Sequence, residues 1–595
     1  MRNLSYIELR EEYINFFKAK NHAEIPSAPL VPEDDASVLF VNAGMFPLVP
    51  FLKGEKHPLG NRLTNSQRCI RTGDIDEVGD TSHCTAFDML GNWSLNDYFK
   101  KEAIEMTVEF LVDIVQFDIN KIYASVFKGE DGIPKDEISI NAWKDVFKKY
   151  DIQAEVGKNQ KIQEYGKEHN WWGLTTGGPC GPDSEIFFDT GKDSCGKECH
   201  INCNCGKYLE IGNNVFMEYL LENGKYSSLG RHNVDFGGGL VRYAMISQGV
   251  DSIYETDIYK PIFFKVKELS VSGNIESQRI ITDHILASTW AIMDGVIPSN
   301  SMQGYILRRL IRRAMRHARK LGIEGTFTKE IGEICIEQFK QVWPKLEEKK
   351  ETILRILGEE EDKFNKTLEK GLKELDRLIQ NKKELTGEDI FKMYETYGLP
   401  KEVIEEILKE RNIQITNIEG FENAKKIHQD KSRTSSAGLF KGGLADTSEM
   451  STKYHTATHL LLSALRKVLG EHVYQKGSNI TTERLRLDFP NGSKLTTEQI
   501  RRVEDIVNSV IKEGLDITYK EVKKEEALKL VPFAAFEEKY GETVKLYYIG
   551  DVNKPFSIEI CNGPHVENTS VLGTFKILKQ ENVGAGVKRI KAVLE

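Results

Sequence analysis

Two histidines four residues apart lie in the apolar run YHTATHLL, residues 454–461. A helix places residues i and i+4 on one face, so His455 and His459 can share a ligand or simply occupy a helix surface. Further along the chain, the run FSIEI is followed by CNGPH, which supplies Cys561 and His565. Three imidazoles and one thiolate form a donor set that tetrahedral Zn²⁺ accepts. Nothing local forces the two pairs together, so two unrelated pairs remain the alternative at this point.

A second group of metal-binding side chains lies in CGKECHINCNC, residues 195–205. Its thiols belong to Cys195, Cys199, Cys203 and Cys205. Four thiols in so short a segment indicate a tetrahedral metal site, and we expect a structural Zn²⁺ that fixes a loop. The spacing is not that of a standard zinc ribbon, so free thiols remain the alternative.

Two arginines stand beside flexible backbone. Arg71 lies in SQRCIRTGD, and Arg242 ends VDFGGGLVR, which also contains Asp235 and Gly237. Guanidinium groups bind phosphate oxygens through two parallel hydrogen bonds, and glycine lets the chain approach a ligand closely. These residues therefore predict a triphosphate site, with a tight turn into a helix as the alternative.

A basic run, YILRRLIRRAMRHARK, covers residues 305–320. At helical spacing it presents a row of arginines, with apolar residues between them turned toward a core. A solvated basic face is the ordinary interpretation. Because the net charge of the chain is −9, a concentrated positive stripe favours contact with RNA phosphates. The arginines that we assign to this RNA contact are Arg308, Arg309, Arg312, Arg313 and Arg316.

The whole chain limits where these groups can act. Its 595 residues exceed what one core can organise, so several domains are expected. The nine cysteines are an odd number, which suits a reducing compartment. No apolar run of membrane-spanning length is present, and the N-terminus is too acidic for a signal peptide. We expect a cytoplasmic location and no membrane partner.

The order of patterns along the chain predicts a multidomain α+β protein. Short β-rich runs, among them SVLFVNAG (37–44), alternate with two helical patterns near 5–18 and 101–116 and predict a largely antiparallel sheet. A long amphipathic region follows, then a polar Gly/Ser-rich stretch, then a helix with alternating strands. The predicted parts are a catalytic domain at 1–245, a helical domain at 246–424, a linker at 425–450 and an α+β module at 451–595.

Several motifs then appear in a fixed order. LFVNAGMFPLVPFLKG, DMLGNWSLNDYF, GGPCGPDSEIFFD, EIGNNVFMEY and PSNSMQGYILRRLIRRA occur along most of residues 1–420. HTATHLL, VYQKGS, CNGPH and GAGVKRIKAV follow within 451–595. This series resembles the alanyl-tRNA synthetases, which are class II aminoacyl-tRNA synthetases. The resemblance implies a class II antiparallel-sheet catalytic domain, a helical tRNA-recognition domain and an α+β editing domain.

The resemblance also implies residue roles. The catalytic residues would be Arg71 on the α-phosphate of ATP, Arg242 on the triphosphate, and Asp235 on the ammonium of L-alanine, with Mg²⁺ accompanying ATP. The rest of the ATP and alanine pocket would be Met89, Trp172, Asn213, Val215 and Gly237. Val241 stands where the family usually has glutamate.

For the C-terminal module the resemblance implies an editing zinc held by the three histidines and Cys561. Thr458 and Gln475 would line the pocket in which Ser-tRNA(Ala) and Gly-tRNA(Ala) are hydrolysed. In the helical domain, Asn300 and Glu395 would read a G·U pair in the acceptor stem of tRNA(Ala), with glutamate in place of the usual aspartate. The β-barrel and the C-terminal dimerisation domain of the longer enzymes are not matched, so we expect a compact, monomeric form.

Two other functions fit part of the pattern. One is a tRNA-binding editing hydrolase whose synthetase half has decayed, and the other is an RNA-binding regulatory protein without catalysis. The retained Arg71, Asp235 and Arg242 argue against the first. The second predicts that changing Arg71 affects no turnover.

Overall fold

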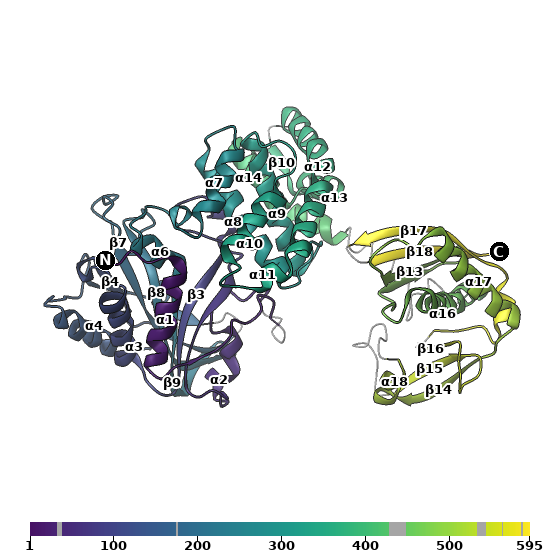
Figure 1. Ribbon diagram of the computed structural model, residues 1–595, viewed down its shortest axis with the longest axis horizontal. Helices are drawn as coiled ribbons and strands as arrows, with labels where there is room; N and C mark the ends of the chain where they lie inside the picture. Colours follow the sequence, from purple (N-terminus) through teal and green to yellow (C-terminus); the bar gives the residue numbers. More distant parts are fainter. Residues whose placement is uncertain are drawn as a thin grey trace. The chain divides into compact units, whose positions relative to one another are not determined.

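The computed structural model describes residues 1–32, 38–173, 177–382, 384–427, 448–531, 543–561, 563–584 and 587–595. The chain forms two compact units, Met1–Lys370 and Gly371–Glu595 (Figure 1). The division falls inside the helical region predicted at 246–424. Most of the predicted linker, 425–450, lies on residues 428–447, outside the described part of the chain.

A nine-stranded sheet organises the first unit. Its order is β1-β2-β3-β9-β8-β7-β4-β5, with β6 paired to β7. Within the described strands of this sheet, the edge pairs β1–β2 and β4–β5 are parallel and every other pair is antiparallel, which confirms the predicted largely antiparallel sheet. The strands are β1 (Ala23–Glu24), β2 (Arg62–Ile70), β3 (Ala86–Leu95), β4 (Ile122–Phe127), β5 (Ile162–Tyr165), β6 (Trp171–Gly173), β7 (Gly178–Asp189), β8 (Tyr208–Glu222) and β9 (Lys225–Gly239).

The register of the two central strands follows from a tight turn. Asn223 and Gly224 both have positive φ, as a two-residue type I′ hairpin requires, and they join β8 to β9. Beyond one bulge, this pairing places Asn213 opposite Gly237. Two motifs that were separate in the sequence therefore meet on neighbouring strands.

Helix α1 packs against one face of the sheet. Its Tyr6 and Tyr13 donate hydrogen bonds to Asp88 and Asn92 of β3, at 2.5 and 2.7 Å. Because alternate residues of a strand face opposite sides, Met89 and the other odd-numbered residues of β3 face away from α1. On that opposite face these residues pack partly against residues 41–52, and a pocket lies beside them.

The helices of the first unit pack on the sheet and on one another (Figure 1). Their bounds are α1 (Tyr6–Ala19), α2 (Val49–Lys53), α3 (Lys100–Val108), α4 (Glu137–Lys149), α5 (Lys167–Asn170), α6 (Leu240–Ser247), α7 (Lys260–Leu269), α8 (Ile275–Met293), α9 (Met302–Lys320), α10 (Thr328–Phe339) and α11 (Lys345–Glu348), while α12 (Lys350–Asn381) crosses into the second unit. A π-helical turn, Glu109–Ile114, extends α3.

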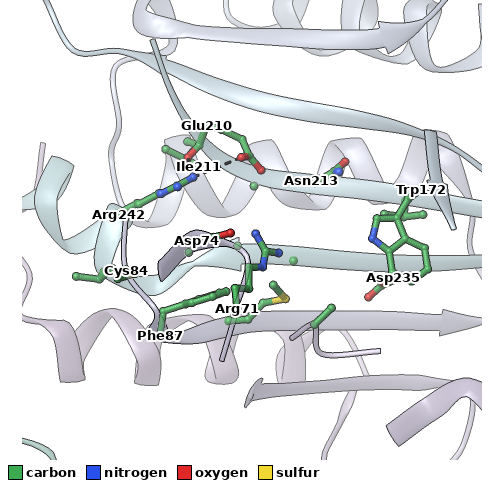
Figure 2. A pocket seen from close by; sticks show the side chains of 18 residues that line it. Arg71, Asp74, Cys84, Phe87, Trp172, Glu210, Ile211, Asn213, Asp235 and Arg242 are labelled. Carbon is green, nitrogen blue, oxygen red and sulfur yellow. Dashed lines mark hydrogen bonds and ion pairs between the residues drawn. The ribbon is translucent and has the colours of Figure 1, made fainter. Parts of the chain in front are cut away.

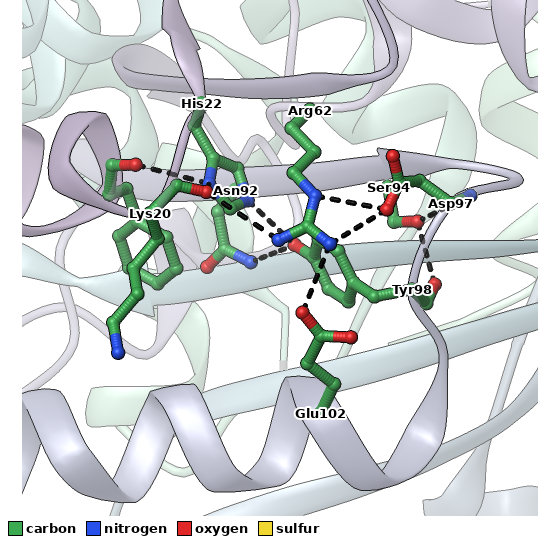
Figure 3. A network of polar contacts seen from close by, with 9 residues as sticks. Lys20, His22, Arg62, Asn92, Ser94, Asp97, Tyr98 and Glu102 are labelled. Carbon is green, nitrogen blue, oxygen red and sulfur yellow. Dashed lines mark hydrogen bonds and ion pairs between the residues drawn. The ribbon is translucent and has the colours of Figure 1, made fainter.

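A polar network fixes the end of α1 against β2 and β3 (Figure 3). Arg62 donates to Asp97 at 2.7 Å and forms an ion pair with Glu102 at 3.0 Å. Beneath it, the Tyr98 hydroxyl lies 3.1 Å from His22 Nε2. Burial lowers the pKa of His22 to about 4, so this imidazole is neutral and serves as packing.

One predicted strand is wrong. The described residues of SVLFVNAG form no strand, and their backbone makes isolated hydrogen bonds instead. Val41 N donates to Leu30 O at 2.8 Å, and Val41 O accepts from Ile70 N at 2.9 Å. The carbonyl of Asn42 accepts from the side chain of Arg71 at 3.2 Å. Phe40, Val41 and Ala43 of this run are buried. Its backbone hydrogen bonds hold the surroundings of Arg71 instead of forming a strand.

The second unit combines helices with small sheets, which confirms the predicted α+β module. Its sheets are β12-β13-β18-β17, β14-β15-β16 and β10-β11. The strands are β10 (Glu384–Thr386), β11 (Gln414–Thr416), β12 (Gly477–Ile480), β13 (Leu485–Pro490), β14 (Ile517–Lys523), β15 (Thr543–Ile549), β16 (Ser557–Ile560), β17 (Phe575–Gly584) and β18 (Val587–Leu594). The helices are α13 (Gly387–Tyr397), α14 (Lys401–Glu410), α16 (Glu449–Leu469), α17 (Thr497–Glu513) and α18 (Lys524–Leu530).

Helix α16 carries the histidine motif into the core of this unit. Ser448 caps its first turn through the N–H of Ser451, and the helix ends at Gly470. Its leucines pack in the main hydrophobic cluster, which buries His455 and His459 with them. Across the described residues, no helix has both the length and the hydrophobicity needed to span a membrane.

Candidate functional site

One pocket on the face of the sheet opposite α1 brings together all the predicted ATP and alanine residues. Figure 2 shows Arg242 and Glu210 at one end, Trp172 and Asp235 at the other, and Arg71 between them. The predicted residues that line it are Arg71, Met89, Trp172, Asn213, Val215, Asp235, Gly237 and Arg242. The sequence did not identify Asp74 and Glu210, two carboxylates that also line the pocket.

Glycines make the floor of this pocket possible. A Cβ on Gly237 would lie 2.9 Å from the sulfur of Met89. A Cβ on Gly91 would lie 2.2 Å from the ring of Trp93. Because Gly91 leaves room for it, the indole reaches Asp235, and its Nε1–H donates to a carboxylate oxygen at 2.7 Å.

Asp235 is the buried acid of the pocket, with 7% of its surface exposed. Burial raises its pKa to about 7, although the hydrogen bond from Trp93 lowers it. A carboxylate with so little hydration gains strongly from an incoming cation. The arrangement suits an ammonium group.

Asn213 presents a free acceptor in the same pocket. Its amide contacts the carboxylate of Asp183, which also accepts from Asn170 Nδ2 at 3.0 Å. Within the described structure, Asn213 Oδ1 is buried without a hydrogen-bond partner. An orphaned acceptor beside a buried carboxylate indicates a ligand that donates hydrogen bonds.

The two arginines occupy the opposite part of the pocket. Arg242 donates to the backbone carbonyl of Glu210 at 2.7 Å and lies 3.4 Å from its carboxylate. Arg71 stacks over Phe87, with 5.1 Å between the guanidinium carbon and the ring centroid. Burial raises the pKa of the nearby Asp74 carboxyl, and Arg71 opposes that shift. Two cations at one end and an acid at the other match a zwitterion joined to a polyphosphate.

The second unit brings the two histidine pairs together. The ligand atoms of His455, His459, Cys561 and His565 all lie within 4.8 Å of one another. Zinc bonds of about 2.0–2.3 Å place tetrahedral ligands at compatible separations. Of the two readings left open by the sequence, the structure therefore selects a single cluster.

The hydrogen bonds of this cluster leave its inner atoms available. His455 Nδ1 lies 3.0 Å from the carbonyl of Pro564, and its Nε2 lies 3.2 Å from Cys561 Sγ. In the described structure, Nε2 of His459 and Nε2 of His565 are buried without a partner. Burial lowers the pKa of all three imidazoles, so they are neutral and can donate lone pairs. The donor set fits a metal ion.

Two neighbours of this cluster were not predicted. Thr456 Oγ1 lies 3.1 Å from His565 Nδ1, which turns Nε2 of that ring inward. Tyr547 packs on His565 with ring centroids 4.5 Å apart. The position of Thr456 between the two motif histidines was the available signal.

The two predicted editing-pocket residues differ in their exposure. Thr458 is buried, and its hydroxyl donates to Tyr454 O at 2.8 Å within α16. Gln475 is partly exposed, and its amide donates to Ser478 Oγ at 3.0 Å.

The cysteine cluster lies on the connection between β7 and β8. Cys195 and Cys203 have sulfurs 3.3 Å apart, and Cys199 and Cys205 have sulfurs 3.6 Å apart. All four sulfurs lie within 4.8 Å of one another, so they form a possible metal site. The backbone N–H of Lys207 lowers the pKa of Cys205 to about 7, which favours a thiolate.

Four of the arginines predicted to face RNA are buried inside the first unit. Each of the four has a relative exposure of 5–7%. Arg309 donates to Asp76 at 2.7 Å and Arg312 donates to Glu360 at 2.8 Å. The prediction of an exposed stripe is therefore corrected for Arg309, Arg312, Arg313 and Arg316. Arg309 and Arg312 meet acids and Arg313 meets the carbonyl of Ile75, all distant in sequence. Long arginine side chains can bury their aliphatic stems in this way.

The other predicted tRNA residues lie at the surface. Asn300 is exposed just before α9, and its side-chain oxygen accepts a hydrogen bond from Arg308. Glu395 lies on the exposed side of α13 in the second unit and accepts from Thr396 at 2.9 Å.

Comparisons with known proteins extend along the whole chain. The family model described as class II tRNA synthetases (A) matches residues 8–481, and that of the threonyl and alanyl tRNA synthetase second additional domain matches residues 544–591. The chain is 48% identical to an alanine–tRNA ligase of Borrelia hermsii over 99% of each chain. It is also 48% identical to that of Treponema denticola over 100% of each. The ligase of Caldicellulosiruptor saccharolyticus is 36% identical, over 99% of this chain and 79% of that relative.

Proposed function

Because the chain belongs to the class II alanyl-tRNA synthetases, we propose that the pocket of the first unit activates alanine with ATP and passes it to tRNA(Ala). This enzyme catalyses the reaction of its family, the ATP-dependent ligation of alanine to tRNA. The residue roles are the proposal, and one observation carries it: all eight predicted residues line a single pocket.

At one end of the pocket, Asp235 and Asn213 bind the alanine ammonium. The carboxylate supplies the charge, and the unpartnered Asn213 Oδ1 accepts one N–H. Val215 and Trp172 border the methyl group. By accepting hydrogen bonds from the ammonium, these two groups orient the substrate carboxylate for attack, which is the main contribution that a site without a general base can make.

At the other end, Arg71 and Arg242 bind the phosphates. The alanine carboxylate attacks the α-phosphorus in line, the bond to the bridging oxygen breaks, and pyrophosphate leaves. Arg71 stabilises charge on the α-phosphate, and Arg242 exchanges Glu210 for the triphosphate. Mg²⁺ bound with ATP would neutralise further phosphate charge, and the carboxylates of Asp74 and Glu210 are the pocket groups suited to hold it.

Selection of alanine by this pocket alone is weak, which is the reason for a second, hydrolytic site. The pocket cannot exclude the smaller glycine, because one methylene contributes only about 1–3 kcal/mol of discrimination. Serine, which adds one hydroxyl, is rejected about as weakly. We propose that His455, His459, Cys561 and His565 hold Zn²⁺, and that this centre hydrolyses Ser-tRNA(Ala) and Gly-tRNA(Ala). Bound zinc supplies a Lewis acid for a carbonyl or a water molecule. The neutral, inward-facing ring nitrogens support this assignment.

The cysteine cluster is proposed as a structural zinc site. It closes the loop between β7 and β8, and β8 carries Asn213. The double change Cys199→Ser with Cys205→Ser should lower the zinc content by one equivalent per chain and raise the KM for alanine. An unchanged zinc content would exclude the site.

The acceptor stem of tRNA(Ala) is proposed to meet Asn300, Arg308 and Glu395. These side chains are at least partly exposed and polar, as contacts to base edges and phosphates require. Replacing the G·U pair of the tRNA by G·C should abolish aminoacylation while alanine activation continues. The monomeric state stays a prediction for sedimentation analysis.

Pyrophosphate exchange with alanine, serine, glycine and threonine tests the main proposal. Exchange should be fastest with alanine, weaker with serine and glycine, and absent with threonine. A chain that hydrolyses Ser-tRNA(Ala) without any exchange would instead be the editing hydrolase considered from the sequence. The intact set of pocket residues favours the synthetase.

A further inference from the structure

The loop between β2 and β3, residues 71–85, carries Arg71 and Asp74 to the ATP end of the pocket. Its only regular structure is the short 3-10 turn Asp74–Asp76. A loop of this length needs external support if it is to hold a guanidinium group in a fixed place. Residues 252–254 hold the middle of the loop at Thr81 and His83, and helices α8 and α9 hold the part that carries Arg71 and Asp74.

Arg313 of α9 reaches the first part of the loop. Its Nη1 donates to the backbone carbonyl of Ile75 at 2.9 Å and lies 2.8 Å from Nε2 of His284. Both side chains are buried, with 5% of Arg313 and none of His284 exposed. Arg309, one turn earlier on α9, donates to both carboxylate oxygens of Asp76 at 2.7 and 2.9 Å.

His284 of α8 connects Arg313 to the other end of the loop through hydrogen bonds. Its Nδ1 lies 2.8 Å from Oδ2 of Asp283, and Oδ1 of Asp283 accepts from the backbone N–H of Thr85 at 2.7 Å. Burial lowers the pKa of His284 to about 4. The ring is therefore neutral: Nδ1–H donates to Asp283, and Nε2 accepts from Arg313.

Thr85 closes the connection to Arg71. Its carbonyl accepts from the backbone N–H of Arg71 at 2.9 Å. An unbroken series of hydrogen bonds thus runs from Arg313 through His284, Asp283 and Thr85 to Arg71. Arg313 therefore contacts the loop directly at the carbonyl of Ile75. Through His284 and Asp283 it is also connected to Thr85, whose carbonyl binds the backbone of Arg71.

We propose that Arg313, His284 and Asp283 are positioning residues for Arg71, holding the loop 71–85 in the geometry that binds the phosphates of ATP. This inference rests on the proposed function, because it assumes that Arg71 binds ATP. None of the three residues is among those that line the pocket in the described structure. Helix α9 begins two residues after Asn300, so the loop and the predicted tRNA contact share one helix.

The test is tRNA-free pyrophosphate exchange with ATP and alanine varied separately. His284→Leu and Arg313→Lys should each lower kcat/KM for ATP about 10- to 100-fold, since a misplacement of about 1 Å can cost that much. The KM for alanine should change much less. His284→Asn should restore most of the activity, because an amide offers one donor and one acceptor to the same neighbours.

A matched control removes another buried bond between the same helices. Ser277 Oγ of α8 lies 2.9 Å from Nδ1 of His317 in α9. Ser277→Ala should lower the melting temperature by a similar amount and leave the ATP parameters unchanged. This separates positioning of the loop from general stability.

The inference is overturned if His284→Leu and Arg313→Lys change only the melting temperature, as Ser277→Ala does. If His284→Leu does not fold, Arg313→Lys decides, because it keeps the buried charge. A wild-type chain without alanine-dependent exchange would overturn the proposed function instead. ATP binding to the same variants, measured by calorimetry, would still test the loop.

Discussion

The pocket of the first unit and the histidine cluster of the second are both buried and polar, but they differ in which of their polar atoms have hydrogen-bond partners. In the pocket the charged groups already have protein partners: Asp235 has Trp93, and Arg242 has Glu210. In the cluster, Nδ1 of His455 and Nδ1 of His565 have protein partners, while Nε2 of His459 and Nε2 of His565 have no partner in the described structure.

This difference separates a site for ligands that leave from a site for an ion that stays. Leaving a buried donor or acceptor unsatisfied costs about 1–3 kcal/mol, so a site that is emptied in each catalytic cycle keeps substitute partners. Converging lone pairs without partners are stable only when a cation joins them. Asn213 Oδ1 is the exception in the pocket, and we assign it to the ammonium of the substrate.

The largest loss of activity confined to one of the two sites is expected for a change at Asp235. Asp235→Asn removes the charge that binds the ammonium, and loss of one partner of a buried charged pair costs about 2–5 kcal/mol. We expect kcat/KM for alanine in pyrophosphate exchange to fall about 10³-fold. Hydrolysis of Ser-tRNA(Ala) by the same variant should remain unchanged and is the internal control. Retention of activity within tenfold of wild type would remove Asp235 from the site.

The reciprocal change acts on the cluster. His459→Ala with His565→Ala removes two of the four ligands, so elemental analysis should find one zinc equivalent fewer per chain. Hydrolysis of Ser-tRNA(Ala) should be lost while alanine-dependent exchange continues. If the zinc content does not change, the cluster holds no ion and the contrast between the two sites fails.

A smaller change sharpens the comparison by leaving all four ligands in place. Thr456→Val removes the hydroxyl that contacts Nδ1 of His565. Loss of such an outer partner weakens metal binding about 10- to 100-fold. Competition with a chelator would measure this change, with Thr452→Val, at a half-buried threonine one turn earlier in α16, as the control. Equal affinities of the two variants would show that Thr456 does not orient the ring.

Much of the pocket could be predicted because its residues lie in motifs that are contiguous in the sequence. What could not be predicted are pairs made by the sheet register. Trp93 and Asp235 are 142 residues apart, yet they are direct neighbours across β3 and β9. Neither residue alone indicates that the indole is the hydrogen-bond donor to the acid.

The arginines of α9 failed as a prediction for a related reason. Helical periodicity counts arginine as polar and places it outside. Arg309 and Arg313 instead find Asp76 and the carbonyl of Ile75, more than two hundred residues earlier. A buried cation can be recognised only when its distant partner is known, and one sequence does not provide that.

The smallest expected effect concerns the acidity of Asp235. Its pKa is raised to about 7 by burial, and only the carboxylate binds an ammonium. Below that pH the protonated form dominates, so kcat/KM for alanine should fall about tenfold for each further pH unit and level off above it. The hydrogen bond from Trp93 lowers this pKa, so Trp93→Phe should move the midpoint to higher pH. Profiles of pyrophosphate exchange for the two proteins measure the shift. A midpoint that stays in place or moves to lower pH would mean that another group controls the profile. In that case the hydrogen bond from Trp93 does not set the pKa of Asp235 in the enzyme without substrate.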